Sequence, residues 1–454
     1  MPGIWETDAE WRRLKRELTA WRVHRAAGDP DGQHRSQLEG CVTLIDGALD
    51  ELHAPIAALT TADPRLAEHC RTHDRRLVWL RRVWQFFRDR FDQRDDAGLA
   101  PTLGAADEVV WSCHRAAFAT PALGMVASSG PPPLPYVEPQ LTPEVFPHGL
   151  VPGDLRRDVD ATFLRTWLQA LPFAIVRLPA SCVTAPWWLV HLGHEVGHVI
   201  DHQCLGYQAR VAIVDDLALD EPSADEWRRW SVETFADAYA ILTFGGWALW
   251  ALARAEARDD AAMLTPRDAY PSPAVRLLVM AHACQTLGVS IAAAQPIVDR
   301  CQALVEGDPT QVTRLRAGTR VVDALLATPV NKQTWRARTA HDPGRWSSQN
   351  LRAWVKRLPG RPAAVAGRAR REWAREVLAA GVLRRWRAET DATFDGDALA
   401  ADLHAWLPAV RETGARSLAT TGVAHSTPQT LGAPKPSGEG GTLAQLLITA
   451  EPLG

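Results

Sequence analysis

The sequence predicts a mainly helical protein with a small β-sheet, an α+β fold. Apolar residues recur every three or four positions along most of the chain, as between Leu77 and Phe91, and this spacing is typical of one buried face of a helix. Residues 173–178 are the clearest strand candidate, because an apolar run rich in Ile and Val lies between Pro172 and Pro179 there. We therefore expect helices to supply most of the core.

Helical spacing recurs in several segments, and the apolar stripes near the N-terminus predict a helical bundle or hairpin with core seams. We expect Pro186 and Pro222 to lie near the starts of two long central helices. The remaining predicted helices are 11–26, 38–59, 77–91, 154–171, several within 273–327, 368–387 and 397–410.

At 454 residues the chain is too long for one ordinary core, and we expect two or three domains. Residues 1–126 form a helical N-terminal region in this division. Residues 127–153 are rich in proline and form a linker or an extended segment. Residues 154–330 form the chemical core, and residues 331–414 form a basic helical region rich in Trp and Arg. Residues 415–454 are rich in Gly, Ser, Thr and Pro and predict a disordered tail.

The N-terminal residues, the apolar segments and the cysteines together predict the compartment of the protein. The first residues carry acids and no apolar stretch, so we expect no secretory signal. The most apolar segment, 235–253, is interrupted by Asp237 and by Gly245 and Gly246, which favours one or two core helices over a membrane span. The seven cysteines are scattered and never spaced Cys-x-x-Cys, which argues against a disulfide framework. We expect a cytoplasmic protein.

The segment 332–387 is strongly basic, with 15 Lys or Arg against three acids, and it contains several tryptophans. A solvated arginine face with tryptophans in the core is the interpretation we favour. The alternatives are a nucleic-acid surface that uses phosphate contacts and base stacking, or a dock for the acidic remainder of the chain.

The candidate chemistry begins in the first central helix. His194-Glu195-Val-Gly-His198 has the pattern His-Glu-x-x-His. Residues four apart lie on one face of a helix, so both imidazoles can bind one metal ion. Glu195 can reach a metal-activated water without binding the metal, which suits a general base.

The second central helix supplies two acids. Ser223 and Glu226 have the spacing of a capping box at its start, and Glu233 and Asp237 share one face further along. A catalytic zinc takes three protein ligands, and a carboxylate can join two histidines. Asp237 can fix the tautomer of a ligand histidine. Both acids lie among apolar residues, where unpaired carboxylates are costly.

These two motifs resemble the gluzincin branch of the zincin metallopeptidases, which combine His-Glu-x-x-His with Glu-x-x-x-Asp on a downstream helix. The resemblance covers residues 130–290 and implies a zincin-like catalytic core. It implies that His194, His198 and Glu233 bind Zn²⁺, that Glu195 is the catalytic base and that Asp237 supports a ligand. It also implies that the strand 173–178 is a sheet edge along which a peptide substrate aligns.

Further residues have open roles. The segment 268–276 resembles a His-Pro segment followed by an Arg that some gluzincins have, and Tyr270 stands at the position of the His. Its hydroxyl could donate a hydrogen bond to an oxyanion. The interpretation we favour is a tyrosine in a turn. His191 and His202 flank the motif and could serve as alternative ligands. The metzincin pattern is excluded, because it needs Gly and His where this chain has Asp201 and Cys204.

The sequence therefore predicts a cytoplasmic zinc metallopeptidase that acts on a protein or peptide. The helical N-terminal region could bind a regulatory protein or gate the site, and we expect no membrane partner. The alternatives are a zincin-like scaffold without activity and a nucleic-acid-associated factor that uses the basic segment. The second is disfavoured, because we expect the tryptophans of that segment to lie in the core.

Overall fold

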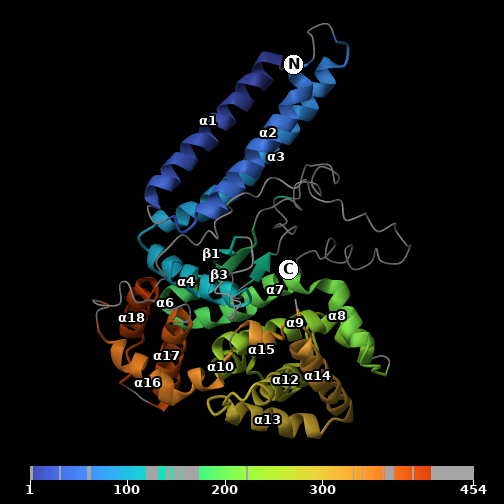
Figure 1. Cartoon of the computed structure of the whole chain (residues 1–454), viewed down its shortest axis with the longest axis vertical. Helices are drawn as coiled ribbons and strands as arrows, with labels where there is room; N and C mark the ends of the chain where they lie inside the picture. The colour runs from blue at the N-terminus through green and yellow to red at the C-terminus, as the bar shows by residue number, and fades with distance from the viewer. Residues whose placement is uncertain are drawn as a thin grey trace. The chain divides into compact units, whose positions relative to one another are not determined.

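The computed structural model confirms a mainly helical protein with a small sheet (Figure 1). None of the helices in the described ranges combines the length and apolar character needed to cross a membrane. The structure describes residues 4–29, 32–58, 63–118, 131–139, 144–146, 155, 173–220, 223–330, 332–339, 341–360, 362, 373–390 and 393–410.

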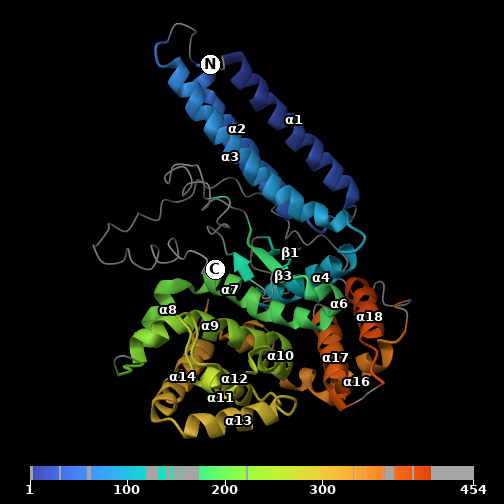
Figure 2. The same cartoon turned by 180° about the vertical axis from the view of Figure 1, so that it is seen from behind.

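Three long helices begin the chain and lie side by side in both views (Figures 1 and 2). They are α1 (Ile4–Gly28), α2 (Arg35–Ala57) and α3 (Leu66–Asp92). The apolar stripe predicted on α3 is part of the core, because each of the five residues of the stripe is buried. These residues are Leu77, Leu80, Trp84, Phe87 and Phe91.

A buried polar cluster joins this bundle to the next helix. After the short η1 (Gln93–Asp95) comes α4 (Ala100–Ala116). Asp107 of α4 accepts two hydrogen bonds from Arg94, at 2.7 and 3.1 Å, and its Oδ2 lies 3.0 Å from His34 Nε2. Beyond this cluster α4 packs into a second, larger core that also contains the central and C-terminal helices.

The sheet has three strands in the order β1-β3-β2. β1 (Leu134–Glu138) runs parallel to β3 (Ile175–Pro179), and β2 (Glu144–Phe146) runs antiparallel to it. The strand predicted at 173–178 is thus present as β3. Its predicted place at a sheet edge is wrong, because β1 pairs with all of β3 and β2 pairs with Ile175, Val176 and Arg177 on the other side.

The central helices follow β3. After α6 (Ser181–Thr184) and the 3-10 helix η3 (Pro186–His191) come α7 (Leu192–Cys204) and α8 (Gly206–Asp215). α9 (Ser223–Phe244) and α10 (Gly246–Glu256) divide the most apolar segment of the chain at Gly245. Gly245 has φ of +61°, a conformation that favours glycine, which is why the helix breaks there as the glycine pair predicted.

The remaining helices follow in the second half of the chain. They are α11 (Asp260–Leu264), α12 (Pro273–Thr286), α13 (Gln295–Glu306), α14 (Pro309–Ala327), α15 (Trp335–Arg338), η4 (Pro343–Trp346), α16 (Ser348–Arg357), α17 (Trp373–Arg387), η5 (Ala388–Thr390) and α18 (Gly396–Ala409). In the basic segment, Trp335, Trp346 and Trp354 are buried in the larger core, as the favoured interpretation expects. These three rings are therefore not available to stack on bases.

Some predictions fall on residues outside the described ranges. They are most of the predicted helix 154–171, the tail 415–454, the start of the helix predicted at 368–387 and most of the proline-rich segment, from which β1 and β2 are described. The described part of the chain includes all seven cysteines, and each is a free thiol.

Candidate metal centre

Two glycines let α7 and α9 approach closely. A Cβ atom added at Gly197 would lie 2.8 Å from the Ala236 Cα, and one added at Gly193 would lie 2.8 Å from the Phe244 ring. Carbon atoms normally pack about 3.5–4.0 Å apart, so neither position accommodates a side chain without movement. Because His194 and His198 each follow one of these glycines, the contact seam also fixes where the imidazoles lie.

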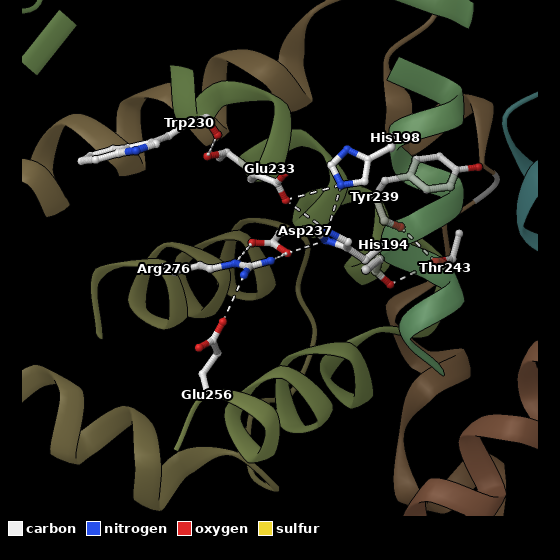
Figure 3. Close-up of polar contacts among 11 residues, drawn as sticks. His194, His198, Trp230, Glu233, Asp237, Tyr239, Thr243, Glu256 and Arg276 are labelled. Atoms are coloured by element: carbon white, nitrogen blue, oxygen red, sulfur yellow. Dashed lines mark hydrogen bonds and ion pairs between the residues drawn. The ribbon is translucent and has the colours of Figure 1, made fainter. Parts of the chain in front are cut away.

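Three ligand-type atoms converge between these helices (Figure 3). His194 Nε2 lies 3.0 Å from His198 Nε2 and 3.2 Å from Glu233 Oε2. His198 Nε2 lies 3.4 Å from the same carboxylate oxygen. In the described part of the chain, this is the one group of three or more His, Cys, Asp or Glu side chains with ligand spacing.

The spacing of these atoms fits zinc. Tetrahedral zinc with bonds of ~2.0–2.1 Å separates its ligand atoms by about 3.3 Å, close to the three distances observed. Glu233 Oε2 is buried and makes no hydrogen bond within the described residues. A divalent cation placed between the three atoms would satisfy the oxygen and both imidazole nitrogens at once.

A ladder of alternating charge extends from His194 away from α7 (Figure 3). Asp237 Oδ1 lies 2.8 Å from His194 Nδ1, so the carboxylate holds the proton on that nitrogen and leaves Nε2 to face the cluster. Arg276 of α12 donates two hydrogen bonds to Asp237, at 2.7 and 2.9 Å. It also contacts Glu256 at 3.3 Å, and Glu256 pairs in turn with Arg267.

The charges that face one another in the cluster shift the pKa values of its members. Burial lowers the pKa of His194, but its contacts with Asp237 and Glu233 outweigh burial and raise it to about 10. Burial raises the pKa of Glu233, but the facing imidazoles hold it well below its ordinary value. Burial likewise raises the pKa of Asp237, and Arg276 and His194 keep it below its ordinary value.

A cavity of about 540 Å³ opens beside the cluster. His194, Glu195 and Asp237 line it, so the proposed base and one proposed ligand border the same space. Tyr270 also lines the cavity, and its ring lies 4.6 Å from the Arg276 guanidinium. Burial raises the pKa of Tyr270 above its ordinary value, so the phenol stays protonated and can donate a hydrogen bond.

The flanking residues have separate places. His191 lines the cavity and stacks on Trp188, with ring centroids 5.8 Å apart, but it is not part of the three-residue cluster. His202 is exposed and also lies outside the cluster. Asp201, at one metzincin position, is buried and pairs with Arg210 at 2.7 Å.

The structure thus brings His194, His198, Glu233 and Asp237 together, with Glu195 and Tyr270 at the adjoining cavity. α9 begins at Ser223, as predicted. Glu226, the second residue of the predicted capping box, accepts two hydrogen bonds from Arg314. Sequence reasoning missed the glycine seam and the Glu256–Arg267 end of the ladder. Gly193 and Gly197 lie four residues apart and each precedes a histidine, and this spacing could have indicated the close helix contact. No local sequence pattern indicates the role of Glu256.

Comparison with protein-family models, with curated proteins and with solved structures finds no match for this chain. The geometry of the cluster is therefore the basis for assigning a function.

Proposed function

We propose that this chain is a zinc-dependent metallopeptidase. The observation that carries the proposal is the convergence of His194 Nε2, His198 Nε2 and the buried Glu233 Oε2 to within 3.0–3.4 Å of one another. Three protein ligands and an adjoining cavity are the arrangement of a catalytic rather than a structural zinc site, which is closed by four ligands.

In this proposal His194, His198 and Glu233 hold the ion, and Asp237 orients His194 through Nδ1. Arg276 holds Asp237 by a bidentate contact, which fixes the carboxylate in two directions. When bound, zinc supplies Lewis-acid activation of water and of a substrate carbonyl. The three ligands and their supports come from three helices, so the packing of α7, α9 and α12 preorganises the site.

Glu195 carries the proton in the proposed reaction. It follows His194 on α7 and lines the cavity, where it can take a proton from the attacking water and pass it to the leaving amine. Hydrolysis breaks the peptide C–N bond; the water oxygen joins the carbonyl carbon, and the amine gains a proton. Tyr270 can donate a hydrogen bond to the negative charge that develops on the carbonyl oxygen.

Paired variants test the function. Purified Glu195→Gln is expected to keep zinc and lose peptide cleavage, because the amide cannot accept the proton, whereas His194→Ala is expected to lose both. Metal content and cleavage of a peptide mixture, followed by mass spectrometry, are measured on the same preparations. Cleavage by Glu195→Gln at the wild-type rate would refute the proposal.

The same preparations separate the other two roles. A scaffold that keeps zinc without activity would show no cleavage by the wild type, and Glu195→Gln would behave like the wild type. A nucleic-acid-associated factor would bind nucleic acid with steep salt dependence through the region 332–387. A cytoplasmic location also stays a prediction, motivated by the seven scattered cysteines.

A further inference from the structure

The cavity beside the metal cluster has arginines in its wall. Arg254 and Arg267 both line it, with side chains 48% and 38% exposed, whereas Arg276 is buried beneath them. Arg254 comes from the end of α10 and pairs with Glu389 at 2.7 Å. Arg267 comes from the connection between α11 and α12. Glu195, Asp237 and Glu256 also line the cavity but are buried, so the two more exposed guanidinium groups are the charges that an anionic group of a ligand would meet.

Arg267 is the exposed end of the charge ladder. The ladder alternates in sign through Asp237, Arg276 and Glu256, which are all buried, and then reaches Arg267 at the cavity. A carboxylate bound to Arg267 would continue this alternation by one step. The buried members of the ladder are paired with one another, so Arg267 is the member that an added negative charge can reach from the cavity.

The guanidinium has donors to spare and a fixed position. A guanidinium offers five N–H donors, and within the described residues the Arg267 side chain donates one hydrogen bond, from Nη2 to Glu256. Backbone hydrogen bonds between Arg267 and Tyr270, at 3.1 and 3.2 Å, hold the turn that carries it. The Tyr270 ring lies 5.3 Å from the guanidinium carbon. Arg267 is therefore preorganised to form a bidentate contact with a carboxylate.

The size of the cavity limits the ligand. Its volume of about 540 Å³ falls in the range of roughly 300–1,000 Å³ typical of small-molecule pockets. That space takes a few residues of a peptide. The rest of the lining includes apolar side chains, which suit the side chains beside a carboxylate; they are Trp188, Val190, Ala248, Leu252 and Met280.

We propose that Arg267 binds a carboxylate of the peptide substrate, an inference that rests on the metallopeptidase function proposed above. The carboxylate has two sources, the free C-terminus of a short peptide or the side chain of an Asp or Glu near the cleaved bond. Both present the same planar pair of oxygens to the guanidinium, and matched peptides distinguish them.

The test uses the full zinc-loaded chain and synthetic peptides in matched pairs. One arm compares peptides that end in a free carboxylate with the same peptides ending in an amide, and the other compares internal Glu with internal Gln. Mass spectrometry gives kcat and KM for each. Because a hydrogen bond to a charged group contributes more than a neutral one, we expect the wild type to prefer the carboxylate form about 10- to 100-fold in one arm.

Variants assign the preference to Arg267. Arg267→Gln is expected to reduce the preference to near unity, mainly by raising KM for the carboxylate peptide, and Arg267→Lys to retain part of it. Arg300→Gln is the matched control, because Arg300 is also 38% exposed and also pairs with one carboxylate, Asp260, but does not line the cavity. A merely structural role for Arg267 would slow both members of each pair equally and leave their ratio unchanged.

The outcomes separate the two proposals. If no cleavage depends on Glu195, the metallopeptidase function fails and this inference falls with it. If cleavage depends on Glu195 but neither arm shows a preference, or Arg267→Gln and Arg267→Lys keep the full wild-type preference, the carboxylate assignment is overturned while the metallopeptidase function stands.

Discussion

The close contact between α7 and α9 makes Gly197→Ala the sharpest structural perturbation of the metal cluster. The added Cβ would lie 2.8 Å from the Ala236 Cα, 3.0 Å from the Ala236 carbonyl oxygen and 3.1 Å from the Tyr239 Cβ. To restore a carbon–carbon contact of about 3.5–4.0 Å, the helices have to separate by about 0.7–1.2 Å. The imidazoles and the Glu233 carboxylate lie on the two helices that move apart.

Two effects on stability oppose each other in this variant. Overpacking costs about 1–3 kcal/mol, whereas alanine favours a helix over glycine by about 1 kcal/mol. The net destabilisation is therefore about 0–2 kcal/mol, and the chain is expected to fold. Metal ligands tolerate displacements of only about 0.2 Å, so we expect zinc affinity to fall by at least about 10-fold.

The assay measures zinc affinity by competition with a chromophoric chelator and stability by urea unfolding. Gly47→Ala is the matched control, because Gly47 also lies inside a helix, α2, and a Cβ there meets no atom within 4 Å. The control is expected to keep zinc affinity and to gain up to about 1 kcal/mol of stability. Wild-type zinc affinity and stability in Gly197→Ala would refute the claim that this contact positions the ligands.

Two further predictions concern buried charge pairs. Arg276→Gln is expected to weaken zinc binding about 10- to 100-fold, because Asp237 loses the bidentate contact that orients it towards His194. Arg314→Gln is the control and should leave zinc affinity unchanged, because it breaks a bidentate pair with Glu226, which lies on α9 as Asp237 does. Equal zinc affinities of the two variants in the chelator assay would contradict this prediction. Burial raises the pKa of Asp107, but Arg94 and His34 outweigh it and keep the pKa well below its unfolded value of about 3.9. Asp107 therefore stabilises the fold fully above about pH 4 and loses this contribution as the pH falls below that value. Urea unfolding should show Asp107→Asn about 3–5 kcal/mol less stable than wild type at pH 7, with the gap narrowing towards pH 2; a gap independent of pH would show that the charge contributes nothing.

Helical periodicity carried most of the fold prediction. The stripe from Leu77 to Phe91 is buried as expected. Apolar residues at every third or fourth position form one face of a helix, and that face can be buried against many different partners. The sheet was harder to predict. β2 has three residues and lies in a proline-rich segment, so it is too short to show the alternation of apolar and polar residues that predicts a strand. Its pairing with β3, which places β3 inside the sheet and not at the edge, could therefore not be predicted.

The candidate site was predictable where chemistry leaves a local pattern. His194 and His198 are one helical turn apart, as are Glu233 and Asp237, and such pairs can be recognised within one helix. Arg276 lies at the end of the segment 268–276, and its contact with Asp237 spans 39 residues of sequence. Contacts of this kind depend on how helices pack, and no spacing rule within one helix predicts them.

Zinc stoichiometry tests the central claim most directly. The full chain is stripped with a chelator, reloaded with excess zinc and dialysed, and bound metal is measured by elemental analysis beside His194→Ala treated in the same way. Convergence of two imidazoles and one carboxylate predicts one zinc ion per wild-type chain and none in the variant. Equal zinc in both proteins, or none in either, would contradict the claim that these side chains form a metal centre.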